Sequence, residues 1–137
     1  MAKQLVSDDA FSIIAAPQFA PDNKTVLFVA SGPPLKPLPG VSLVAPSCEP
    51  ALLCFFARPL QANGLPWDLW LVTVDGARFQ QLTHQGYDSP WPAWSHAGKY
   101  IAWMDTGGIY MLDVARQVTT KVSDNGGHGV FSWWSGD

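Results

Sequence analysis

The sequence is poor in charged residues and in cysteine, and each shortage excludes a class of protein. Charged residues make up 14% of the 137 positions and hydrophobic residues 47%, a balance that excludes an intrinsically disordered chain. The net charge is −3 and no basic run occurs, so nothing indicates a nucleic-acid partner. Two cysteines, Cys48 and Cys54, are too few for a disulfide framework, and their spacing fits no common zinc pattern. One short disulfide and two free thiols both stay open, and we expect neither a metal nor a cofactor.

The chain also lacks a long hydrophobic run. The longest one, from Pro50 to Ala57, lies between Glu49 and Arg58 and is much shorter than the roughly 20 residues that a membrane-spanning helix needs. Asp8 and Asp9 interrupt the first 20 residues, so we find no signal peptide in this chain. Localisation stays unassigned: cytoplasmic by default, and exported if the chain is part of a longer precursor.

What the sequence does contain is an internal repeat. The segment Trp91–Trp103, WPAWSHAGKYIAW, has a near copy 75 positions earlier in APQFAPDNKTVLF. The later segment GIYMLDV repeats DLWLVTV at a distance of 40 positions, and Trp134-Ser135 repeats Trp94-Ser95 at the same distance. The unit is therefore about forty residues long, and its first copy carries an insertion of about 35 residues. In the second copy we expect four short strands, at about 91–95, 100–104, 109–114 and 119–123.

The repeat resembles a known family. Pro-x-Trp/Phe-Ser-x-x-Gly-Lys-x-Ile-Ala-Trp, followed by Ile-Tyr-Met-Leu-Asp and by Gln-Leu-Thr, is similar to the TolB-type, WD40-like β-propeller repeat. The resemblance covers about residues 1–30 and 67–137. It departs from the usual pattern at Ala20, where serine is usual, and at His96-Ala97, where Pro-Asp is usual. Both departures fall in turns, and they leave the fold assignment in place.

We therefore predict an all-β fold: a partial β-propeller of two four-stranded antiparallel blades plus a flanking strand at each end, in a single domain over 1–137. Blade one is expected at about 8–86, with the insertion at 31–66, and blade two at about 87–127. Residues 1–7 and 128–137 are predicted to be strands of adjoining blades. Aromatic residues at equivalent blade positions are expected to pack between the sheets: Phe19, Phe28, Trp94, Trp103 and Trp134.

Two blades cannot close a propeller ring, which usually has four to eight. They leave large apolar faces, more than a soluble monomer normally exposes. We therefore predict a protein partner or self-association that completes the propeller, in a homo-oligomer or a larger complex. The alternative is a remnant of a larger exported propeller.

The insertion holds eight of the twelve prolines and only three charged residues. Its bulky apolar run is consistent with a strand or a short helix, and both stay open. A long apolar loop either covers the core or binds a partner. We predict a binding patch made of Leu52, Leu53, Phe55, Phe56 and Arg58, with a lid over the blade pair as the alternative.

The leading functional hypothesis is a non-catalytic protein-interaction or scaffold module that acts through its rim loops and the insertion. The alternative is an enzyme or ligand-binding fragment with a rim site near His84, Asp88, His96 and His128, although no ligand-like spacing supports it. No Gly-x-Ser-x-Gly elbow occurs, so the chain lacks the nucleophile motif of the serine peptidases that carry such propellers. We predict no enzymatic activity.

Overall fold

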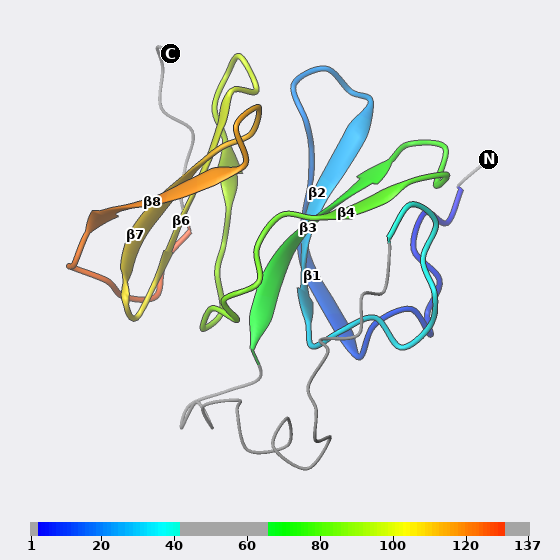
Figure 1. The fold of residues 1–137 in the computed structure, drawn as a ribbon, viewed down its shortest axis with the longest axis horizontal. Helices are drawn as coiled ribbons and strands as arrows, with labels where there is room; N and C mark the ends of the chain where they lie inside the picture. Colours follow the sequence, from blue (N-terminus) through cyan, green and yellow to red (C-terminus); the bar gives the residue numbers. More distant parts are fainter. Residues whose placement is uncertain (1–2, 42–65, 131–137) are drawn as a thin grey trace.

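The computed structural model describes residues 3–41 and 66–130, and it is built from two antiparallel sheets (Figure 1). Sheet A has the order β1-β2-β3-β4 and sheet B the order β5-β6-β7-β8. The described residues contain strands and no helix, as the sequence predicted, and therefore no helix that is long and apolar enough to cross a membrane. The strands are β1 (Ile13–Phe19), β2 (Thr25–Ser31), β3 (Trp67–Thr73), β4 (Phe79–Gln81), β5 (Ala93–Trp94), β6 (Tyr100–Asp105), β7 (Gly108–Asp113) and β8 (Val118–Ser123).

The repeat in the sequence is a repeat of hydrogen bonds in the structure. In the β1–β2 turn the amide of Ala20 donates to the carbonyl of Thr25 at 2.9 Å, and in the β5–β6 turn Ser95 donates to Tyr100 at 2.8 Å. These pairs lie 75 positions apart, which is the offset of the two sequence copies. The unusual residues at Ala20 and His96 therefore leave the turn geometry unchanged.

Both turns also place one residue in the left-handed region at the same position of the repeat. Asn23 has a φ of 56° in the first turn and Gly98 has a φ of 71° in the second. Asparagine and glycine are the residues that adopt this conformation at the lowest cost. The turn chemistry of the two copies is therefore equivalent although their residues differ.

Each sheet has one aromatic and one aliphatic face, because side chains alternate along a strand. The register pairs Phe28 with Trp70 in sheet A and Trp103 with Tyr110 in sheet B, and these pairs define the aromatic face of each sheet. The aliphatic face is defined by the neighbouring pairs, which are Leu27 with Leu71 and Val29 with Leu69 in sheet A, and Ala102 with Met111 and Met104 with Ile109 in sheet B.

The main core lies between the two sheets, where the aliphatic face of sheet A packs on the aromatic face of sheet B. We call this contact the junction. Leu27, Leu69, Ile101, Trp103 and Leu112 are each 0% exposed there. The two sheets stand side by side, as adjacent blades of a propeller do (Figure 1).

A second core covers the aromatic face of sheet A. Two segments, 3–12 and 32–41, lie on the side of sheet A that points away from sheet B (Figure 1). We call these segments the cap. Phe11 is 5% exposed and meets the rings of Phe28 and Trp70 edge-on, at centroid distances of 5.7 and 5.0 Å. Leu38, from the second segment, is buried in the same cluster. The cap therefore covers the aromatic face of sheet A over β2, β3 and β4.

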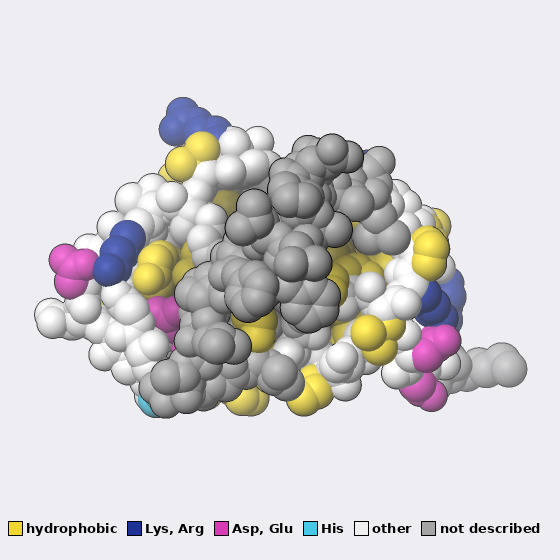
Figure 2. Space-filling view, turned by 60° about the horizontal axis from the view of Figure 1, so that its bottom comes forward, with side chains coloured by type: hydrophobic (Ala, Val, Ile, Leu, Met, Phe, Trp, Pro, Cys, Tyr) yellow, Lys and Arg dark blue, Asp and Glu magenta, His cyan; other side chains and the backbone are white. Residues whose placement is uncertain are grey.

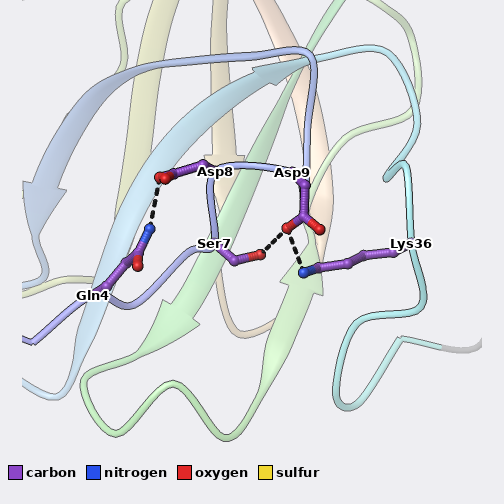
Figure 3. Close-up of polar contacts among 5 residues, drawn as sticks. All are labelled: Gln4, Ser7, Asp8, Asp9 and Lys36. Atoms are coloured by element: carbon purple, nitrogen blue, oxygen red, sulfur yellow. Dashed lines mark hydrogen bonds and ion pairs between the residues drawn. The ribbon is translucent and has the colours of Figure 1, made fainter.

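Polar contacts join the two halves of the cap (Figure 3). Lys36 donates from Nζ to Oδ1 of Asp9, and the Ser7 hydroxyl donates to the same oxygen at 2.6 Å. These two hydrogen bonds lower the pKa of the Asp9 carboxyl to about 2. Gln4 donates to Asp8 at 2.7 Å on the preceding turn. Residues 3–7 form no strand with the other described residues, and their assignment to an adjoining blade stays a prediction.

Candidate interaction surface

The cap and the junction use the same aromatic arrangement. Tyr87, in the connection between the sheets, meets Trp103 and Tyr110 edge-on at 5.1 and 5.0 Å, as Phe11 meets its two partners in the cap. Phe11 therefore contacts the aromatic pair of sheet A in the way that Tyr87 contacts the aromatic pair of sheet B. The sequence did not indicate this role, because Phe11 and Leu38 are isolated apolar positions outside the repeat and no periodicity marks them.

The cap leaves strand β1 uncovered. Its buried contacts come from β2, β3 and β4, and on β1 the side chains of Ile14 and Phe19 are 49% and 63% exposed. The prediction that Phe19 packs between sheets is therefore wrong. Phe19 pairs with Val26 and lies on the aromatic face, against which the described residues place no second sheet, whereas its repeat counterpart Trp94 is 8% exposed in the junction.

The other aromatic predictions divide by position. Phe28 is buried under the cap and Trp103 in the junction, as expected, while Trp134 lies outside the described residues. Among the described residues, the buried indole N–H groups of Trp70, Trp94 and Trp103 have no hydrogen-bond partner. Packing against the neighbouring side chains holds these rings in place.

The aliphatic face of sheet B has no sheet against it among the described residues. Met104, Ile109 and Met111 are half-buried there, and the neighbouring strand β8 adds Val118 and Val122, which are 53% and 59% exposed. The matching face of sheet A is fully buried in the junction. The blade pair therefore has one capped end and one open end.

The turns divide between two rims of the molecule. The turns after β1, β3, β5 and β7 lie at the top of Figure 1, and the connections after β2, β4, β6 and β8 lie at the bottom, because consecutive strands are antiparallel. We call these the upper and lower rims. Figure 2 views the molecule with the lower rim turned forward, and charged side chains lie mainly toward the periphery of this view, with hydrophobic ones nearer its middle.

The insertion leaves and returns at the lower rim. Ser31 ends β2 and Trp67 begins β3, and these two residues pair directly. Next to them the amide of Gly32 donates to the carbonyl of Pro66 at 3.0 Å. The predicted patch of Leu52, Leu53, Phe55, Phe56 and Arg58 lies outside the described residues, between these fixed ends.

Two aspartates organise the lower rim around Tyr87. Asp68 accepts a hydrogen bond from the Thr83 hydroxyl at 2.7 Å, and Asp105 accepts one from the amide of Gly107 at 2.7 Å. Burial of Tyr87, together with Tyr110, Asp105 and Asp68 nearby, raises the pKa of its phenol. Tyr87 is therefore neutral over the physiological range. The carboxylates are engaged in shaping loops, which is a structural role.

The histidines do not gather at one rim. His96 lies in the β5–β6 turn at the upper rim, while His84 and Asp88 follow β4 at the lower rim. His128 is also at the lower rim, because its neighbour Gly127 donates to the carbonyl of Asp105 at the end of β6. Within 3–41 and 66–130, no group of three His, Cys, Asp or Glu side chains could hold a metal ion. The rim site predicted from all four residues is therefore not assembled.

Comparison with known proteins identifies the fold and goes no further. No family model and no curated protein matches the sequence. Among solved structures, the chain is similar to TolB from Acinetobacter baumannii, a β-propeller, with a TM-score of 0.52 and 15% sequence identity. The match covers 85% of this chain and 23% of TolB, so the chain spans about a quarter of that protein. Two adjacent four-stranded antiparallel sheets fit a partial propeller.

Proposed function

We propose that this protein is a non-catalytic protein-interaction module of the β-propeller type, which binds a partner protein through its lower rim and its apolar insertion. One observation carries the proposal: the insertion is anchored on paired residues of β2 and β3, two strands at the centre of sheet A. Ser31 is 2% exposed, and its pairing with Trp67 continues the full β2–β3 ladder. A loop held on such a scaffold presents its side chains from a fixed base.

The composition of the insertion suits a protein contact. Leu52, Leu53, Phe55 and Phe56 supply large apolar side chains, and Arg58 adds a planar cation beside them. Aromatic and arginine side chains are the types that contribute most binding energy at protein interfaces. We propose these five residues as the contact patch.

The cap argues against a ring of identical copies joined head to tail. Such a ring needs the aromatic face of sheet A, and residues of the cap such as Ala10 and Phe11 already bury that face at 1% and 5% exposure. Joining copies there requires the cap to leave, which exposes its apolar side chains. Self-association, if it occurs, is therefore expected through the insertion patch.

The test is a pair of serine substitutions in the full chain. Phe55→Ser with Phe56→Ser removes the aromatic anchors. Phe19→Ser is the matched control, because Phe19 is exposed at the upper-rim end of β1, whereas the insertion is anchored at the lower rim. We expect the double variant to lose the partner protein captured by the wild type, or to fall to a smaller particle mass by light scattering, while the control retains both. Unchanged partner binding and mass in the double variant contradict the proposal. So does a wild-type monomer that captures no protein.

A further inference from the structure

We propose that the aliphatic face of sheet B is a docking surface for a β-strand that carries an aromatic side chain, and that residues 131–137 of this chain are that strand. The proposal concerns the open end of the blade pair and is independent of the insertion. It assigns Trp134 the place on sheet B that Trp94 occupies on sheet A.

The first step is the equivalence of the two aliphatic faces. Val29 and Leu69 pair in sheet A, and their repeat counterparts Met104 and Ile109 pair in sheet B. Val29 and Leu69 are 2% and 0% exposed because sheet B covers them. The junction therefore shows how the aliphatic face of one sheet is covered: the next sheet along the chain packs against it.

The second step is the identity of the covering element. The strand that follows sheet A in the chain is β5, and its Trp94 is buried in the junction with Leu27 and Leu71 of the aliphatic face. The sequence repeats Trp94-Ser95 forty positions later as Trp134-Ser135. By the same spacing, the residues around Trp134 correspond in sequence to β5, the first strand that follows sheet A.

After β8, the chain runs back along the end of β6 toward the aliphatic face of sheet B. The amide of Gly127 donates to the carbonyl of Asp105 at 2.8 Å, which holds the chain at the end of β6. At Gly126 a Cβ atom would lie 2.2 Å from that same carbonyl oxygen, so only glycine fits this close approach. At Gly129 a Cβ atom would lie 2.7 Å from Cε of Met104. The chain has therefore reached the aliphatic face of sheet B two residues before Phe131.

The chemistry of the face agrees with an aromatic occupant. Met104 and Met111 are flexible, polarizable side chains that adapt to irregular shapes and make favourable contacts with aromatic rings. They lie on the same face of the β6–β7 pair, Met104 on β6 and Met111 on β7, and Trp134 would cover this face by analogy with Trp94. Both are half-buried, so the face still has accessible apolar area to bury.

The methionines also provide the test, because the chain has three of them: Met1, Met104 and Met111. Oxidation of the full-length protein by hydrogen peroxide, followed by mass spectrometry, gives a rate for each, with Met1 as the internal reference. In the Trp134→Ala variant we expect the oxidation rates of Met104 and Met111 to rise by about threefold or more, because their cover is lost. Trp134→Phe keeps a ring and is expected to keep most of the protection.

The matched control is Phe19→Ala, since Phe19 is 63% exposed on β1 of sheet A and its loss leaves the aliphatic face of sheet B untouched. Circular dichroism on each variant checks that the sheets are retained. Unchanged methionine rates in a folded Trp134→Ala protein overturn the proposal. Protection that disappears on dilution regardless of Trp134 also overturns it, and identifies a second copy as the occupant. The insertion variants leave these rates unchanged, so failure here is distinct from failure of the proposed function.

Discussion

Replacing Ser95 by alanine removes the side chain that closes the β5–β6 turn. The Ser95 hydroxyl oxygen accepts hydrogen bonds from two backbone amides, that of Lys99 at 3.0 Å and that of Tyr100 at 2.8 Å. Ser95 itself is 0% exposed, beneath the turn. Alanine keeps the backbone conformation available and deletes the acceptor only, so the substitution isolates these two bonds.

The expected cost follows from the number of bonds and their burial. An intramolecular hydrogen bond contributes about 1 kcal/mol net, and a buried group left without a partner costs about 1 to 3 kcal/mol. Two amides lose their acceptor at a site that the Ser95 side chain shields from water. We expect Ser95→Ala to lower the free energy of unfolding by about 1 to 3 kcal/mol.

The equivalent turn offers the reverse experiment. Ala20 occupies the place of Ser95 in the β1–β2 turn, with the same backbone hydrogen bonds, and there Asp22 accepts from the amide of Lys24 at 2.9 Å. Ala20→Ser restores the missing acceptor, and we expect a gain of up to about 1 kcal/mol.

Urea unfolding followed by tryptophan fluorescence measures both changes as shifts of the midpoint at constant slope. A cost below about 0.5 kcal/mol for Ser95→Ala would refute the reasoning, because water would then be replacing the hydroxyl.

Two further predictions concern the cap. Phe11→Ala is expected to lower the free energy of unfolding in urea by about 3 to 5 kcal/mol, because a buried ring is removed from two aromatic contacts. The control Phe19→Ala removes an exposed ring and is expected to change it by less than about 0.5 kcal/mol. Equal costs for the two variants would mean that the cap does not cover sheet A. The pKa of Asp9 is lowered in the folded state by Lys36 and Ser7, so its contribution to stability is present above pH 4 and is lost as the pH falls toward 2. Asp9→Asn is expected to reduce stability at pH 7 and to remove this part of the acid dependence when the urea midpoint is measured as a function of pH. Parallel curves of midpoint against pH for the wild type and the variant would contradict this prediction.

The open and capped ends give the blade pair a direction. Repeat proteins stack one unit on the next, and a terminal unit needs something other than a neighbour to cover its outer face. Here Phe11 and Leu38 perform that covering on sheet A, and we propose the residues around Trp134 for the same role on sheet B. Any assembly built on this module is therefore expected to form through the insertion.

The sequence by itself determined the repeat, the strands and the turns. Strand alternation and turn chemistry are local: Asn23 and Gly98 sit where a left-handed residue is needed, and Ser95 closes its own turn within five residues. Sequence reasoning therefore predicted strands of sheet B that agree with the structure to within a few residues at each end. The all-β class followed from the same local signals.

Only the tertiary structure decided which faces are covered. Nothing local distinguishes Phe19 from Trp94, yet Phe19 is 63% exposed and Trp94 is 8% exposed. Within the part of the chain that the structure describes, a sheet packs against Trp94 and none packs against Phe19. The cap likewise depends on two segments far apart in sequence, joined by Lys36 and Asp9. The separation of His96 from His84 follows from strand direction in three dimensions. Burial is a property of the partners that meet across a face, and the pattern within one segment does not specify those partners.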